Sequence, residues 1–110
     1  MDGFSQPMTD VAGPAFYSDC SAEDQAFALP RLVPQPIAPM MEVLDFEPPD
    51  VPRHYILCSK DRVVLPRYQA RATEDWPREN VRQMDTGHSP FFSDPHGLVA
   101  HLDAISGLDR

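Results

Sequence analysis

Proline is the residue that most limits what this chain can fold into. Thirteen of the 110 residues are proline, and seven of these lie between Pro30 and Pro52. Because proline fixes φ and has no backbone N–H, residues 34–52 cannot form a regular helix or a central strand. This range also holds several large apolar side chains, which are Ile37, Met40, Met41, Val43, Leu44 and Phe46. Flexible linkers seldom carry so much apolar surface, so we expect an extended strap that lies on a protein surface, with a flexible linker as the alternative.

Charge is distributed unevenly along the chain. Residues 1–50 hold nine acidic side chains and one basic one, residues 51–110 hold eight of each, and the formal net charge is −8. An acidic chain is not attracted to phosphate backbones or anionic membrane surfaces, so we expect no nucleic acid and no membrane as partners. No apolar run approaches the ~18 residues that a membrane span needs, and the start lacks a secretory signal pattern. With only two cysteines, a reducing, cytoplasmic location is expected.

The N-terminal part contains one helix pattern. Residues 1–15 have no apolar period and are rich in small and polar side chains, so they are interpreted as a mobile tail. After it, Ser21 is a suitable N-cap for a short helix. Ala22, Ala26 and Leu29 follow at helical spacing and would form its apolar face, until the next proline kinks or ends the helix.

The C-terminal part, residues 53–110, is typical of a folded α/β unit. Residues 54–58 (HYILC) form the short apolar pattern expected of a strand that is buried on both faces in a parallel sheet. Residues 80–84 (NVRQM) predict a second, weaker strand. A helical pattern follows each strand, so the order strand, helix, strand, helix predicts two parallel strands joined by a right-handed crossover.

Both helices of this unit have recognisable first turns. The first begins near Pro66, at a position where a missing N–H costs nothing, and ends before Pro77. Its predicted apolar face consists of Leu65, Tyr68, Ala72 and Trp76. The second has Asp94 as its N-cap and Pro95 in its first turn. Its predicted core face consists of Leu98, Val99, Leu102 and Ile105.

Two titratable residues follow the two predicted strands. Asp61 comes after the first strand, in CSKDR, and His88 comes after the second, in DTGHSP. Because functional groups collect at the carboxyl ends of parallel strands, we expect the Asp61 carboxylate within hydrogen-bond distance, ~3 Å, of the His88 imidazole. An Asp in this position fixes the tautomer of the His and stabilises its protonated form. A solvated loop acid and an unrelated loop histidine are the alternative interpretation.

Three segments carry a resemblance to a known family. They are FYSDCSAEDQAFALPRLVPQPIAPM, HYILCSKDRVVLP and MDTGHSPFFSDP. Together they resemble the lid segment, the Asp loop and the His loop of α/β-hydrolase-fold esterases, in the branch related to plant methylesterases and hydroxynitrile lyases. The resemblance covers about residues 16–106 and implies a partial α/β-hydrolase fold. Residues 16–52 would form a lid-like helix and the proline-rich strap, and residues 53–110 the C-terminal β-α-β-α unit.

The resemblance also implies roles for individual residues. Asp61 would be the acid of a catalytic triad and His88 its base, and the intact enzyme would act on a small-molecule ester. The lyases of this branch carry a Lys close to this His, whereas Ser89 and Pro90 follow it here, which favours ester hydrolysis over cyanohydrin cleavage.

The chain departs from the family pattern at the nucleophile. Family members have the chain order Ser, Asp, His, with the Ser in a G-x-S-x-G elbow. Residues 3–7 (GFSQP) are the nearest imitation, and they lack the second glycine and a preceding strand. We therefore expect a truncated, C-terminal part of a hydrolase that carries two of three triad members, has no nucleophile and is inactive alone.

Other chemistry-bearing residues have simpler interpretations. His96 and His101 are five residues apart and diverge on a helix, so no metal is expected. Cys58 lies in an apolar strand and is interpreted as an inert core thiol. Ser89 is too close in sequence to His88 to serve as its nucleophile. No cofactor is expected.

Two functions stay open at this point. The first is ester hydrolysis, with the chain as one part of a triad enzyme. The second is a non-catalytic interaction or regulatory remnant of a hydrolase that docks on a partner chain. The expected partner is then a complementary hydrolase chain or a second copy, because an apolar strand with an unpaired edge promotes association.

Overall fold

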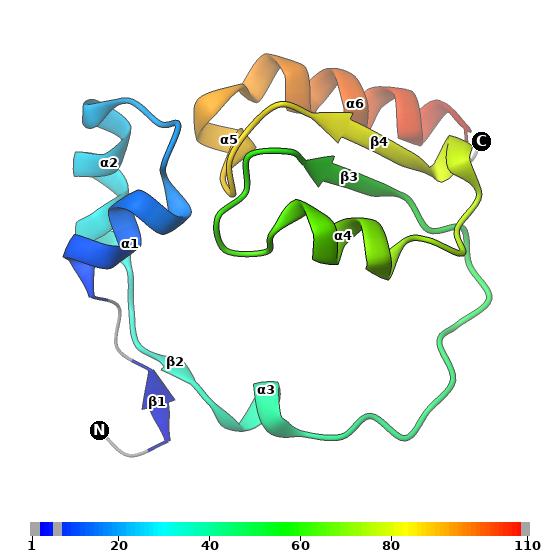
Figure 1. The fold of residues 1–110 in the computed structure, drawn as a ribbon, viewed down its shortest axis with the longest axis horizontal. Helices are drawn as coiled ribbons and strands as arrows, with labels where there is room; N and C mark the ends of the chain where they lie inside the picture. Colours follow the sequence, from blue (N-terminus) through cyan, green and yellow to red (C-terminus); the bar gives the residue numbers. More distant parts are fainter. Residues whose placement is uncertain (1–2, 6–7, 109–110) are drawn as a thin grey trace.

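The computed structural model describes residues 3–5 and 8–108 of the chain (Figure 1). Two short helices, α1 and α2, lie at one end of the molecule, and a two-stranded sheet with its flanking helices lies at the other. A long strap joins the two ends. In chain order the elements are β1 (Phe4–Ser5), α1 (Thr9–Phe16), α2 (Ala22–Ala28), the 3₁₀ turn η1 (Leu29–Arg31), β2 (Gln35–Pro36), α3 (Ala38–Met41), β3 (Tyr55–Cys58), α4 (Pro66–Ala72), the 3₁₀ turn η2 (Arg78–Asn80), β4 (Val81–Met84), α5 (Pro90–Ser93) and α6 (Pro95–Leu108).

The sheet that positions the site is the parallel pair β3–β4. Tyr55 lies opposite Val81 and Cys58 lies opposite Met84 in the register. Both strands point their carboxyl ends toward α1 and α2 (Figure 1). The predicted parallel arrangement is confirmed, and α4 contacts β3 while α6 contacts β4.

Helix α4 begins at Pro66 as predicted but turns a different face to the sheet. Its most buried side chains are Gln69, which is 2% exposed, and Thr73, just beyond its end, which is 1% exposed. Tyr68, expected on the apolar face, is 54% exposed, so this part of the prediction is wrong. The physical reason is that the Gln69 amide satisfies backbone groups of β3, accepting from Cys58 N at 2.9 Å and donating to Cys58 O at 3.1 Å.

Helix α6 is capped as predicted, because Asp94 Oδ1 accepts from Gly97 N at 3.0 Å. Its predicted core face is only partly correct. Leu98 and Ile105 are half-buried, whereas two further members of that face are mostly exposed, Val99 at 63% and Leu102 at 51%. A straight helix that crosses a two-stranded sheet meets it along a narrow stripe, so the outer members of a wide apolar face stay in solvent.

The N-terminal residues carry structure that the interpretation as a mobile tail did not include. Helix α1 occupies residues 9–16, and Phe4 and Ser5 of β1 pair antiparallel with β2. This part of the prediction is therefore corrected, while residues 1–2 and 6–7 lie outside the described residues. The physical reason is that the C-terminal end of α1 is anchored by burial of apolar side chains. Tyr17, which follows the last residue of α1, packs in a hydrophobic core with Cys20 and Ala28.

Helix α2 confirms the predicted cap, and of the predicted face only Leu29 packs against the core. Ser21 Oγ accepts from Asp24 N at 3.1 Å, and the helix passes into the 3₁₀ turn η1 at the following proline. Ala28 is buried and Gln25 half-buried, whereas both predicted alanines, Ala22 and Ala26, are exposed. Gln25 faces inward because its Nε2 donates to Tyr17 O at 3.1 Å and to Cys20 O at 3.2 Å, in the segment between α1 and α2.

The strap of residues 34–52 has little regular structure, as its prolines require. It contains the two residues of β2 and the single turn of α3, and it runs along one side of the molecule, away from the sheet (Figure 1). Its apolar side chains are exposed, with Met41 at 74% and Val43 at 86%. The expectation that the strap lies on a surface is not met within the described part of the chain. None of the described helices is long and apolar enough to cross a membrane.

Candidate active site

The loop after β3 holds Asp61 in a fixed orientation. The side chain is 7% exposed, and its Oδ1 atom accepts from the backbone N–H groups of Val63 at 2.8 Å and Val64 at 3.0 Å. Gln69 supports the same loop, because its Nε2 donates to Val64 O at 2.6 Å. A carboxylate with two backbone donors keeps its position and its remaining lone pairs are available to another group.

The loop after β4 brings His88 onto this carboxylate. His88 Nδ1 lies 3.1 Å from Asp61 Oδ1 and 3.1 Å from Asp61 Oδ2. The two predicted site residues are thus brought together at the predicted distance. Because an ionised carboxylate only accepts, Nδ1 carries the proton in this pair, and Nε2 of the neutral ring is left as the acceptor.

The strand ladder continues past the ends of the two strands. Ser59 N donates to Met84 O at 2.9 Å, and Lys60 N donates to Thr86 O at 2.9 Å. These bonds keep the two loops side by side, which explains why residues far apart in sequence meet here. Beyond them, Ser59 Oγ donates to Asp85 Oδ1 at 2.8 Å, and this hydrogen bond lowers the pKa of the Asp85 carboxyl.

The imidazole of His88 is neither buried nor free. Its side chain is 35% exposed, and the ring of Phe16 lies 5.5 Å from it, centroid to centroid, at an interplanar angle of 38°. Within residues 3–5 and 8–108, nothing hydrogen-bonds its Nε2. A reacting hydroxyl could therefore approach that atom.

Ser89 is excluded as a nucleophile by its surroundings as well as by its place in the chain. It is 2% exposed, and its Oγ donates to Phe16 O at 2.8 Å. A buried hydroxyl that donates to a backbone carbonyl is not available to the base.

Neither cysteine has the environment of a reactive thiol. Burial raises the pKa of Cys58, and the nearby carboxylates of Asp61 and Asp19 add to this. Burial also raises the pKa of Cys20, together with Asp19 and Asp24. Both thiols are therefore protonated near neutral pH, which for Cys58 agrees with its interpretation as an inert core thiol.

A metal site is not found among the described residues, which contain no group of three suitable His, Cys, Asp or Glu side chains. His96 is exposed, whereas His101 is half-buried and its Nδ1 accepts from Arg82 Nε at 2.8 Å. The two histidines therefore have different environments and do not act together.

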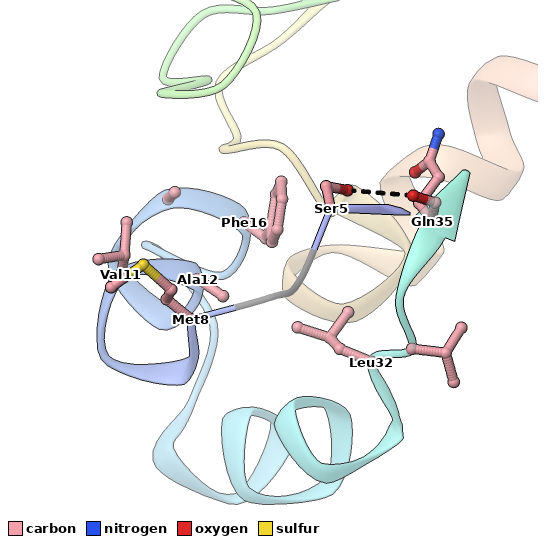
Figure 2. Close-up of a pocket in the computed structure, with 9 residues that line it drawn as sticks. Ser5, Met8, Val11, Ala12, Phe16, Leu32 and Gln35 are labelled. Atoms are coloured by element: carbon pink, nitrogen blue, oxygen red, sulfur yellow. Dashed lines mark hydrogen bonds between the residues drawn. The ribbon is translucent and has the colours of Figure 1, made fainter. Parts of the chain in front are cut away.

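A pocket of about 380 Å³ lies beside the site, between α1 and the segment that leads into β2 (Figure 2). Its lining is mainly apolar and includes Met8, Val11, Phe16 and Leu32, and Ser5 closes one side by donating to Gln35 O at 3.4 Å. Since Phe16 also contacts the ring of His88, the pocket and the Asp–His pair share one wall.

The sequence analysis missed three residues that support the site, Phe16, Gln69, and Asp19, whose Oδ2 accepts from Gly87 N at 2.7 Å. Gln69 could have been noticed as a polar residue inside a helical pattern, at a position that its neighbours predict to be buried. Phe16 and Asp19 act from the other end of the chain, and no local pattern indicates their contacts with the His88 loop.

Comparison with known proteins defines the class to which this fold and site belong. The alpha/beta hydrolase family matches residues 2–101, and the chain is a member of this family. Within the family it is similar to plant methylesterases. It is 35% identical over 102 residues to pFDCC methylesterase MES16 of Arabidopsis thaliana, which covers 86% of this chain and 38% of that protein. It is also 35% identical over 92 residues to pheophorbidase of Raphanus sativus, which covers 79% of this chain and 35% of that protein.

A solved structure gives the same relationship. The crystal structure of the Arabidopsis methylesterase MES16 matches with a TM-score of 0.85 at 26% identity, over 96% of this chain and 47% of that chain. The chain thus spans less than two fifths of these curated relatives and about half of the solved one. The partial α/β-hydrolase fold and the resemblance to methylesterases are confirmed.

Proposed function

We propose that this chain supplies the acid and the base of a Ser-His-Asp triad that hydrolyses carboxylic esters. The observation that carries the proposal is the pair formed by Asp61 and His88, with Nδ1 at 3.1 Å from both carboxylate oxygens. Methylesterases among the relatives make a methyl ester the first substrate class to test.

The chemistry follows from the tautomer of His88. With the proton on Nδ1, the Nε2 atom takes the proton of a serine hydroxyl as that hydroxyl attacks the ester carbonyl. Asp61 then stabilises the imidazolium, and Nε2 returns the proton to the leaving alkoxide. Water then attacks the acyl-serine that remains, Nε2 takes its proton and returns it to the serine oxygen, and the carboxylic acid is released. The backbone donors at Val63 and Val64 hold the carboxylate in place throughout.

The serine and the oxyanion donors would come from polypeptide outside these 110 residues, because they contain no G-x-S-x-G elbow. The chain alone therefore gives only slow general-base hydrolysis of an activated ester. The apolar pocket beside Phe16 is where an apolar part of the substrate would lie, since Phe16 both lines it and contacts the His88 ring.

The test is a chimera in which this chain replaces the matching segment of the Arabidopsis methylesterase. We expect the chimera to hydrolyse p-nitrophenyl acetate and a methyl ester with saturable kinetics, and His88→Ala to abolish this activity. His96→Ala, which changes an exposed histidine of α6, is the matched control and should retain the activity. The isolated chain should show a slow, non-saturating background that His88→Ala removes. A folded chimera in which His88→Ala keeps full activity would contradict the proposal.

Exposed apolar residues favour a second candidate function, docking on a partner chain without catalysis. The strap presents Met41, Val43, Leu44 and Phe46 with 64–86% of their surface exposed. This candidate requires the isolated chain to bind the complementary part of a hydrolase, which is measured by calorimetry with the remaining N-terminal part of the Arabidopsis methylesterase. Binding without any hydrolysis in the complex would favour it over the triad proposal.

A further inference from the structure

Residues 16–19, which precede α2, form hydrogen bonds with the His88 loop on both sides of the histidine. On one side, Gly87 N donates to Asp19 Oδ2 at 2.7 Å. On the other side, Ser89 Oγ donates to Phe16 O at 2.8 Å. Between them, the Phe16 ring covers the imidazole at 5.5 Å. Residues separated by 68 to 73 positions in the chain therefore make three different contacts around one side chain.

The fit at Gly87 is so close that a larger residue would force neighbouring side chains to move. A Cβ atom at this position would lie 2.7 Å from Asp19 Oδ1 and 2.9 Å from Ser18 Oγ, which is closer than such atoms approach. The absence of a side chain at Gly87 thus lets its backbone approach the Asp19 carboxylate without displacing Asp19 or Ser18. The hydrogen bond that results is charge-assisted, which makes it stronger than a bond between neutral groups.

We infer that residues 16–19 are a positioning segment for His88, with Asp19 in the segment and Ser89 in the His88 loop as the positioning residues. This inference rests on the proposed function, in which His88 is the base. Asp61 fixes only one ring nitrogen, and an imidazole held at one atom can still swing about that bond. The contacts at Gly87 and Ser89 fix the backbone on either side of the ring and so fix the direction in which Nε2 points.

The same segment connects the base to the apolar pocket. Phe16 lines the pocket and also covers the His88 ring. An apolar group that occupies the pocket would hold Phe16 against the imidazole. Occupancy of the pocket would thus be coupled to the ordering of His88. The expected consequence is that loss of the segment's contacts lowers kcat of the assembled enzyme more than it raises KM.

The test uses the full chain labelled with ¹⁵N and compares pairs of variants. Asp19→Ala and Ser89→Ala each remove one contact, whereas Asp19→Asn and Ser89→Thr keep an acceptor and a hydroxyl. Glu23→Ala, an exposed acid in α2, and Ser93→Ala, in α5, are the matched controls. Two signals are followed, the hydrogen exchange of the Gly87 amide and the ring ¹⁵N shifts of His88, which report its tautomer.

We expect Gly87 to exchange slowly in the original chain and about 10-fold faster in Asp19→Ala, with protection largely restored in Asp19→Asn. At about pH 8.5, where ordinary imidazoles are neutral, the original chain should hold His88 in the Nδ1–H form. Asp19→Ala and Ser89→Ala should shift His88 toward the Nε2–H form, and Ser89→Thr and both controls should not. A merely structural role would change stability without changing the tautomer.

Other results separate the two proposals. If the Gly87 amide exchanges as fast in the unsubstituted chain as in Asp19→Ala, the proposal of a positioning segment is wrong. This holds whether the segment alone is loose or the whole chain lacks tertiary structure. If no variant changes the tautomer of His88, the positioning proposal is also wrong. The Nδ1–H form in the unsubstituted chain would in that case still support the proposed triad. An original chain in which His88 is mainly Nε2–H contradicts the proposed function itself.

Discussion

His88 Nδ1 lies 3.1 Å from each carboxylate oxygen of Asp61, although the two residues are 27 positions apart in the chain. The distance is set by the ladder that continues beyond β3 and β4, since Lys60 N donates to Thr86 O at the point where both loops begin. The carboxylate is buried and the ring is partly exposed. This combination orients the histidine and leaves its second nitrogen accessible.

Replacement of Asp61, the proposed triad acid, should lower activity without unfolding the protein. In the methylesterase chimera, Asp61→Asn places an amide beside Nδ1 and favours the wrong tautomer, so we expect kcat to fall about 10⁴-fold. KM should change little. The measurement is steady-state hydrolysis of p-nitrophenyl acetate, with Asp75→Asn on the exposed turn after α4 as the control. A fall of less than about tenfold in a folded variant would contradict the role of Asp61.

Gln69 should be important for stability because it satisfies buried backbone groups at the end of β3 and in the loop that follows. Gln69→Leu leaves Cys58 N and Val64 O without their Gln69 partner, whereas Cys58 O keeps its bond from Asp61 N at 3.3 Å. Each unsatisfied buried group costs about 1–3 kcal/mol, so the free energy of unfolding should fall by about 2 kcal/mol or more. Urea unfolding followed by circular dichroism measures this. Gln83→Leu, on the exposed side of β4, should change the free energy by less than about 0.5 kcal/mol.

Gly87→Ala tests the close approach of the two loops. The added methyl group would meet Asp19 Oδ1 at 2.7 Å, so we expect a loss of about 1–3 kcal/mol in the free energy of unfolding. In an Asp19→Ala background the same change should cost clearly less, because the conflicting carboxylate is gone. Gly107→Ala, in α6 with open space around it, should be neutral or stabilising. Equal costs of Gly87→Ala in both backgrounds would show that Asp19 is not the obstacle.

The two cysteines should be slow to react until the pH is high. The pKa values of Cys58 and Cys20 are raised, mainly by burial, so the thiolate that attacks iodoacetamide is scarce at pH 8. Labelling should be clearly faster in urea and should accelerate in the folded chain only at higher pH. Because the folded pKa lies above the unfolded one, these thiols also stabilise the fold at neutral pH, and this contribution is lost as the pH rises through the folded pKa. Fast labelling of both residues in the folded chain at pH 8 would contradict the burial.

Self-association is expected from the apolar surface of the strap. Met41 and Leu44 are 74% and 72% exposed, so the isolated chain should form concentration-dependent oligomers in analytical ultracentrifugation. Met41→Glu combined with Leu44→Glu should shift the distribution toward monomer. Ala26→Glu, an exposed position on α2, is the control for added charge. A monodisperse original chain at high concentration would contradict this prediction.

The sequence by itself determined the features that depend on near neighbours. Proline positions ruled out a regular strap, the caps at Ser21 and Asp94 marked where α2 and α6 begin, and two short strands separated by a helix required a parallel pair. A parallel pair brings its two carboxyl ends together, so Asp61 and His88 could be paired before the structure was known. In each case the physical cause acts within a few residues or through a topological rule.

Tertiary structure alone decided which faces are buried and what holds the histidine. The helical pattern of α4 marks Gln69 only as a polar residue at a position expected to be buried, and the choice between Gln69 and Tyr68 depends on the backbone groups of β3 that need a partner. The contacts of Phe16 and Asp19 with the His88 loop join the two ends of the chain. A contact of that kind is set by how α1 and α2 pack against the loop, and neither segment records it in its own sequence.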